Sequence, residues 1–265
     1  MMKKTILLFL SLALALSLAA CGGGKTPAAT QTPAPAPTAE PTPTPEPEST
    51  PEPTEDPALR DARLAAYQLA LHQFAYDLRW PDGSETYFDP NFGLMEENFY
   101  AICDVNGDGA EELVIRFVTA PMAGKAERVY AYDAETGIYE ALSGFPEISY
   151  YESGIAVLPV SHNQGYAGDA LWPYSAYRYN AETGLYDFAA AVDAWSREMK
   201  AEGYPEEVDA EGAGAVYYVT EDSFARAEPI SKSAFEAWET EFFGGEAPIA
   251  LPLHGMGEFD AAGAN

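Results

Sequence analysis

The chain has 265 residues, of which 42 are acidic and 14 basic, and its formal net charge is −28 at pH 7. A field of this sign repels nucleic acid and anionic lipid headgroups, so the composition excludes a nucleic-acid-binding protein and a domain that lies on an anionic membrane surface. With only two cysteines, the chain cannot rely on a framework of several disulfide bonds, and its stability must come from a packed core.

The first 20 residues have the pattern of a secretory signal peptide. Two lysines precede an apolar run over residues 5–18, and two alanines follow it. The run is shorter than the roughly 20 apolar residues of a membrane-spanning helix, which disfavours the alternative of a transmembrane anchor. The order of positive, apolar and small residues therefore predicts export of the chain.

The leader ends in Leu18-Ala19-Ala20-Cys21, which resembles the bacterial lipobox. In proteins with this motif the cysteine is lipidated and becomes the mature N-terminus, so the resemblance implies acyl chains on Cys21. Several acyl chains on one residue give a stable anchor. We therefore expect a lipoprotein on the extracytoplasmic side of the cell membrane, with a plain cleaved signal peptide as the alternative.

Residues 21–55 differ sharply in composition from the rest of the chain. Between Lys25 and Pro57, prolines alternate with Ala, Thr and Glu, and no large apolar residue occurs. Such a tract cannot enclose a core and is expected to be disordered. Alternating prolines favour polyproline II, a semi-rigid spacer of about 3.1 Å per residue. The sequence predicts a stalk here, followed by one globular domain at residues 56–253.

The predicted domain begins and ends with a helix. Asp56 fits an N-cap and Pro57 the first helical position, and apolar residues at spacings of three and four follow as far as Leu78. A second helix is expected after Ser231 or Ser233, with its aromatic residues facing inward. We expect residues 192–200 to form a short helix and residues 254–265 to form an irregular tail.

Most of the sequence between the two helices has the pattern of short strands. The expected strands cover residues 99–103, 113–118, 128–132, 138–142, 154–160, 176–180, 185–189 and 215–219. Together with the helices they predict an α+β fold, in which an N-terminal and a C-terminal helix pack on an antiparallel, twisted sheet of hairpins.

A ten-residue pattern occurs twice, at residues 130–139 and 177–186. Each copy has Tyr-x-Tyr, then Asp or Asn, then Ala-Glu-Thr-Gly. Asp or Asn opens a turn by bonding to its own backbone, and glycine supplies a positive φ. We expect two hairpins of one antiparallel sheet. Propeller blades are the alternative, which the terminal helices disfavour.

Residues 104–112, Asp-Val-Asn-Gly-Asp-Gly-Ala-Glu-Glu, contain the one motif with recognisable chemistry. Ca²⁺ takes six to eight oxygen ligands, and alternate positions of a tightly coiled loop point inward. The spacing matches the first five ligand positions of an EF-hand-like loop. The predicted Ca²⁺ ligands are therefore Asp104, Asn106, Asp108, the carbonyl of Ala110, and Glu112.

The loop departs from an EF-hand, because its twelfth position is Ile115 and strands are expected on both sides. It resembles the strand-loop-strand calcium sites of FG-GAP and integrin-type repeats. It is also similar to the DxDGDGxxEL loop of uncharacterised lipoproteins from Gram-positive gut bacteria. The resemblance implies a structural calcium ion, and Glu111 is expected to alternate outward into solvent. A metal-free hairpin of Asn-Gly and Asp-Gly turns is the alternative.

No catalytic motif is evident, although a Ser-His-Asp arrangement would leave no local pattern. Tyr166, Asp169 and Trp172 form a possible ligand surface, since aromatic rings beside polar groups can stack on sugars or hold a peptide. The alternative is a long connection in which Trp172 and Tyr174 pack into the core.

The leading expectation is a lipid-anchored module that is stabilised by Ca²⁺ and binds an unknown cell-surface ligand, either glycan or protein, without catalysis. A secreted hydrolase acting on glycan or peptide and a structural cell-envelope protein are the alternatives.

Overall fold

The computed structural model describes residues 55–160, 164–222 and 227–263. The signal peptide, Cys21 and nearly all of the proline-rich stalk lie outside the described residues. The same holds for positions 264–265 at the end of the predicted tail. The predictions for these segments therefore stay predictions.

Helix α1 spans Pro57–Asp77 and begins where the sequence predicts. The Asp56 carboxylate accepts a hydrogen bond from the Ala58 N–H at 2.9 Å, and proline occupies the first turn. The helix ends at Leu78, a cap residue in the left-handed conformation with φ 54°. The predicted apolar stripe is confirmed for Tyr67, Leu71 and Phe74, which are all buried.

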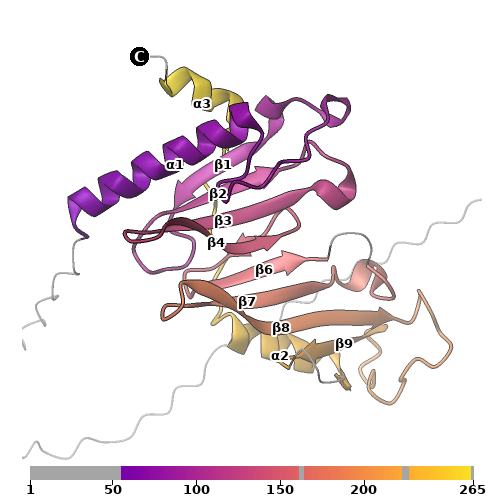
Figure 1. Ribbon diagram of the computed structural model, residues 1–265. Helices are drawn as coiled ribbons and strands as arrows, with labels where there is room; N and C mark the ends of the chain where they lie inside the picture. The colour runs from indigo at the N-terminus through magenta and orange to yellow at the C-terminus, as the bar shows by residue number, and fades with distance from the viewer. Residues whose placement is uncertain (1–54, 161–163, 223–226, 264–265) are drawn as a thin grey trace, which may run out of the picture. The chain divides into compact units, whose positions relative to one another are not determined.

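Two antiparallel sheets make up the rest of the domain (Figure 1). The first has the strand order β11-β1-β2-β3-β4. Its strands are β1 (Phe99–Cys103), β2 (Glu112–Phe117), β3 (Ala126–Asp133), β4 (Gly137–Gly144) and β11 (His254–Gly255). Three short 3-10 helices flank it, η1 (Pro90–Phe92), η2 (Met95–Glu97) and η3 (Met122–Gly124).

The second sheet has the order β10-β9-β8-β7-β6-β5. Its strands are β5 (Ser149–Tyr150), β6 (Ile155–Pro159), β7 (Tyr174–Asn180), β8 (Leu185–Ser196), β9 (Ala215–Thr220) and β10 (Pro229–Ile230). A further 3-10 helix is η4 (Gly168–Ala170), and the remaining helices are α2 (Lys232–Phe242) and α3 (Met256–Gly263). The α+β class and the antiparallel hairpins are confirmed, whereas the single sheet expected from the sequence is replaced by two.

Each face of the first sheet is buried against a different partner. Leu113 and Ile115 of β2 pack on the α1 side chains, while Val114 between them faces Tyr150 and Ala156 of the second sheet. A strand buried on both faces needs apolar residues at successive positions, which explains the uninterrupted Leu-Val-Ile run of β2. The core therefore lies partly between α1 and the first sheet and partly between the two sheets.

Helix α2 covers the other face of the second sheet, as Figure 1 shows. Ser231 is its N-cap and accepts the Ala234 N–H at 3.3 Å. The Phe235 ring stacks on Tyr217 of β9, with ring centroids 4.4 Å apart. Phe235 is buried and Trp238 partly buried against the same cluster, so the expected inward-facing aromatic side is present.

The two copies of the repeated sequence form hairpins in different sheets. The first is β3–β4 and closes at Asp133 opposite Gly137, whereas the second is β7–β8 and closes at Asn180 opposite Leu185. This difference of one residue in register turns the Tyr-x-Tyr side chains of the first strand to opposite faces, whereas Tyr139 and Tyr186 of the second strand both pack between the sheets. Tyr130 consequently packs against α1, while its counterpart Tyr177 packs between the sheets.

Two further expectations from the sequence were wrong. Residues 192–200 do not form a helix, because β8 continues to Ser196 and pairs with β7 on one side and β9 on the other. Residues 254–263, the described part of the predicted tail, are not irregular. His254 and Gly255 pair with β1, which makes them an edge strand of the first sheet, and α3 follows directly.

Candidate functional site

The β1–β2 loop coils around the side chains that the sequence marks as ligands. Asp104 accepts hydrogen bonds from the backbone N–H groups of Gly107 at 2.7 Å and Gly109 at 2.9 Å. Both glycines have positive φ, 79° and 90°, which other residues rarely adopt. The Asn106 amide oxygen accepts the Asp108 N–H at 2.8 Å, so the loop is built from successive side-chain turns.

Glu112 reaches into the loop from the first position of β2. Its side chain is buried, and it accepts the Val105 N–H at 3.0 Å and the Asn106 side-chain amide at 2.9 Å. Burial raises the pKa of Glu112 to about 8, and the charges of Asp108 and Asp104 add to this rise. None of these three carboxylates forms an ion pair with a basic side chain in the described part of the chain.

The second sheet contributes directly to the surroundings of this loop. A Cβ atom at Gly107 would lie only 2.1 Å from the Glu152 carbonyl oxygen, and one at Gly154 only 2.9 Å from the Asn106 carbonyl oxygen. These close approaches require glycine at both positions. The turn between β5 and β6 therefore packs backbone to backbone against the loop.

Two tyrosines from the β7–β8 hairpin complete the surroundings. The Tyr179 hydroxyl group donates a hydrogen bond to Asp108 Oδ2 at 3.0 Å. Tyr186 is buried, and its hydroxyl donates to the Val105 carbonyl at 3.4 Å. Burial is the main cause of the raised pKa of both phenols, so they remain protonated donors at neutral pH.

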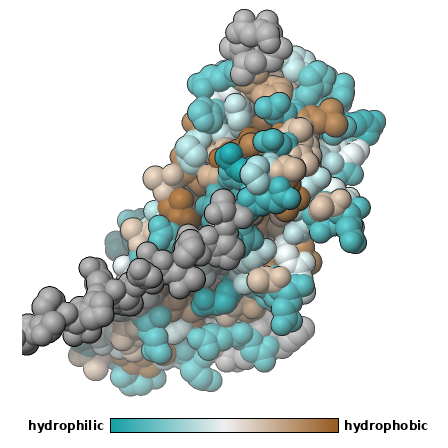
Figure 2. Space-filling model, turned by 90° about the vertical axis from the view of Figure 1, so that its left-hand side faces the viewer, coloured by the Kyte–Doolittle hydropathy of each residue, from teal (hydrophilic) through white to brown (hydrophobic). Residues whose placement is uncertain are grey.

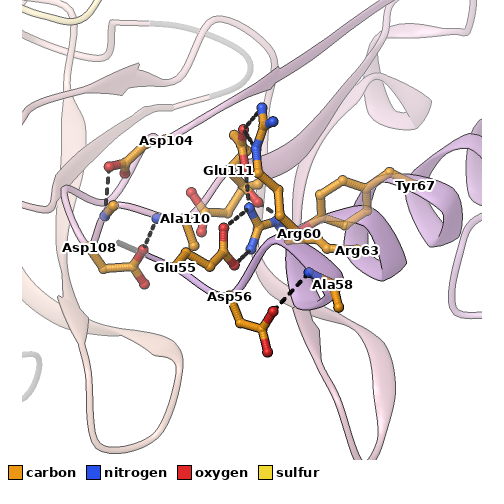
Figure 3. A network of polar contacts seen from close by, with 12 residues as sticks. Glu55, Asp56, Ala58, Arg60, Arg63, Tyr67, Asp104, Asp108, Ala110 and Glu111 are labelled. Atoms are coloured by element: carbon orange, nitrogen blue, oxygen red, sulfur yellow. Dashed lines mark hydrogen bonds and ion pairs between the residues drawn. The ribbon is translucent and has the colours of Figure 1, made fainter. Parts of the chain in front are cut away.

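Glu111 does not project freely into solvent, contrary to the expectation from the sequence. Figure 3 shows its carboxylate between two arginines of α1. Arg60 Nε donates to Glu111 at 2.8 Å, and Arg63 bridges Glu111 and Glu55. The Tyr67 hydroxyl also donates to the Glu111 carbonyl at 3.0 Å. We call this set of contacts the α1 clamp, because it attaches the helix to the loop.

Cys103 lies at the end of β1, next to the loop, and is a partly buried free thiol. Burial is the main cause of the rise of its pKa to about 11, and Glu112 and Asp104 raise it further. A thiol with this pKa carries little thiolate at neutral pH, which fits a structural role rather than that of a nucleophile.

The loop has the chemistry of an oxygen-ligand site, but its acidic groups alone do not complete one. Within the described residues, no cluster of three or more His, Cys, Asp and Glu side chains could hold a metal ion. The predicted shell also includes the Asn106 amide oxygen and the Ala110 carbonyl. Hard oxygen ligands of this kind are the type that Ca²⁺ takes in proteins.

The possible ligand surface expected from the sequence is divided in the structure. Trp172 is 45% exposed and lines a groove between the two sheets, whereas Asp169 lines a different groove beside Ser196 and Ala215. Tyr166 is 54% exposed, and its ring lies near Trp195, with the Lys200 ammonium 5.1 Å from the Tyr166 ring centroid. Trp172 and Asp169 therefore line separate grooves, and Tyr166 lines neither of these two.

The comparisons with known proteins give no relative for this chain. We found no family model, no curated protein and no solved structure that matches it. Within the described residues, no helix is both long and apolar enough to span a membrane. Figure 2 shows one face on which hydrophilic residues predominate and hydrophobic residues occur in small groups.

Proposed function

We propose that the chain is a lipid-anchored extracytoplasmic protein whose single domain is a binding or accessory module stabilised by Ca²⁺ at the β1–β2 loop. The observation that supports the calcium site best is the burial of Glu112 beside Asp104 and Asp108. Within the described residues, the Glu112 carboxylate accepts hydrogen bonds only from the Val105 backbone N–H and the Asn106 side-chain amide.

A bound cation gives this arrangement a physical reason. Carboxylates that share a small volume repel each other and oppose ionisation, and burial adds a desolvation cost. A divalent ion offsets both effects, because it favours the ionised form of every ligand. The Asx turns of the loop support this role, since they fix the backbone before a cation binds and reduce the ordering that binding requires.

The proposed location rests on the leader, the lipobox-like sequence at Cys21 and the proline-rich tract after it. A strongly acidic domain at the end of such a tract is held near the membrane without lying on anionic lipid. A mass spectrum of membrane-extracted protein should carry acyl mass on Cys21. An unmodified mature N-terminus would contradict the anchor and favour plain secretion.

The calcium site is tested by thermal unfolding with and without the cation. Extracellular calcium modules bind in about the 10⁻⁴ to 10⁻³ M range, so about 10 mM Ca²⁺ should raise the melting temperature by about 3–11 °C over EDTA. Asp104→Ala should abolish this difference. Asp133→Ala is the matched control, because Asp133 caps the β3–β4 turn in the same way but is not one of the predicted ligands.

Two results would contradict the calcium site. One is an identical melting temperature in Ca²⁺ and in EDTA for the unmodified chain. The other is a calcium response of Asp104→Ala as large as that of Asp133→Ala.

A further inference from the structure

A groove with a volume of about 480 Å³ lies between the two sheets. Its walls come from the residues directly after β2 and directly before β3, the segment joining β4 to β5, and strands β6 and β7 with the residues before β7. Phe145, Val157, Pro159 and Trp172 give it a mainly apolar lining. A groove of this size and composition suits a small organic ligand.

The indole ring of Trp172 is held in place at this groove. Its Nε1–H donates a hydrogen bond to the Val160 carbonyl at 2.8 Å, yet 45% of the residue remains exposed. The polar edge of the ring is therefore satisfied by the protein, while part of its apolar surface is left open. A ring fixed before binding costs a ligand little conformational entropy.

The groove also contains two opposite charges that do not neutralise each other. Lys125 and Glu147 both line it, but no ion pair joins them. Among the lysines and arginines of the described ranges, Lys125 alone lacks both an ion pair and a contact with an aromatic ring. A partly buried cation without a partner is unusual in a chain with a net charge of −28.

The backbone at Glu147 is held in a strained conformation by a buried carboxylate. Its φ is 73°, and Leu78 is the other non-glycine residue with positive φ in the described part of the chain. The Glu147 N–H donates to Glu127 Oε2 at 3.0 Å. Glu127 is fully buried and also accepts hydrogen bonds from Arg116 and from the Tyr150 hydroxyl at 2.9 Å. Strain held in this way is characteristic of ligand-binding sites.

We propose that this groove binds an apolar zwitterion, an amino acid or short peptide whose carboxylate pairs with Lys125, whose ammonium group pairs with Glu147, and whose apolar side chain packs on Trp172. The inference rests on the binding role proposed above and specifies its ligand. A sugar fits less well, because the lining offers few polar groups for its hydroxyls. A fatty acid also fits less well. If its carboxylate paired with Lys125, the Glu147 carboxylate would lie beside its apolar chain.

Calorimetric titration of the full chain in detergent tests the ligand class. Phenylalanine and alanylphenylalanine are the probes. The probe that binds more tightly shows whether the ligand is a free amino acid or a peptide. The acetylated form of that probe lacks the ammonium group, and its amide lacks the carboxylate. We expect each capped form to bind about tenfold more weakly than the parent, the effect of losing one charge-assisted hydrogen bond.

Variants assign each charge to its partner. Lys125→Met should weaken binding of the free probe about tenfold and leave the affinity for the amide unchanged. Glu147→Gln should also weaken binding of the free probe about tenfold, but leave the affinity for the acetylated form unchanged. Lys232→Met is the control, since Lys232 is exposed and pairs with Glu236 on α2. Every variant should keep the melting temperature and the calcium response of the unmodified chain.

The inference is overturned if neither probe binds, or if the free and capped forms bind equally, which would indicate an apolar patch only. Either result with the calcium response intact removes this ligand and leaves the calcium site in place. Absence of the calcium response in a chain that binds the probes would instead count against the calcium site alone.

Discussion

The hydroxyl group of Tyr179 donates its hydrogen bond to Asp108 across a separation of 71 residues, and this bond joins the second sheet to the acidic loop of the first. Tyr186 follows on the adjacent strand and donates to the backbone of the same loop. The loop is therefore held by three separate elements, which are the β7–β8 hairpin, the β5–β6 turn and the α1 clamp.

The Tyr179 bond can be tested against a neighbour on the same strand. Tyr179→Phe removes the donor to Asp108 and should lower the free energy of unfolding by about 1 kcal/mol, the usual net contribution of one hydrogen bond. Tyr177→Phe is the control, because the described residues include no hydrogen bond from its hydroxyl. Equal losses in the two variants, measured by urea unfolding, would show that the bond to Asp108 contributes nothing.

The α1 clamp contains two arginines that share one glutamate but differ in burial. The Arg63 side chain is 4% exposed and bridges Glu55 and Glu111, whereas that of Arg60 is 53% exposed. Arg63→Met should lower the free energy of unfolding by roughly 2 kcal/mol, because it leaves Glu55 without a basic partner and removes the buried one of the two arginines that contact Glu111. Arg60→Met should change it little, since water screens the exposed pair. Chemical unfolding of both variants gives the comparison, and similar losses would contradict it.

Among the charged residues that the structure describes, Glu127 is the most deeply buried. Glu127→Gln keeps its size but leaves Arg116 without a counter-charge, so a loss of about 3 kcal/mol in unfolding free energy is expected. Glu135→Gln, on the exposed β3–β4 turn, is the control and should be nearly neutral. If thermal unfolding gives the same small change for both, the pair contributes little to stability.

Glu239 provides a test of pH dependence. Burial raises the pKa of this carboxyl, although a hydrogen bond from Tyr174 opposes the shift. A raised carboxyl pKa means that ionisation disfavours the folded state, so this cost is absent below the unfolded value of about 4.3 and grows as pH rises towards the folded value. Glu239→Gln should therefore raise the melting temperature at pH 7 more than at pH 4. Glu241→Gln, at an exposed position on the same helix, should show no such difference between the two pH values. An equal rise in melting temperature at both pH values for Glu239→Gln would contradict the prediction.

The features predicted correctly from the sequence depend on residues close together in the chain. The start of α1 follows from Asp56 and Pro57, and the hairpin at Asp133 from one Asx turn and one glycine. The backbone coiling of the acidic loop follows in the same way from Asp104 and its glycines. In each case the signal and the structure lie within about one turn of the chain.

The errors arose where distant segments decide the outcome. We expected a helix over residues 192–200, but pairing of Val192 with β7 and of residues 192–196 with β9 makes the first part of this segment a strand. The partnership of Glu111 with Arg63 spans 48 residues, and no local pattern indicates it. The pairing of His254 with Tyr100 is equally invisible in a two-residue strand.

The α1 clamp also determines how the domain would respond to tension. Glu55 is the first described residue, and its ion pair with Arg63 lies immediately before the helix. A pull on the chain ahead of Glu55 would therefore load this ion pair before it reached the first turn of α1. From Arg63 the load would pass through Glu111 into β2, a central strand of its sheet, so that force would be spread over a hydrogen-bonded ladder instead of peeling the helix away.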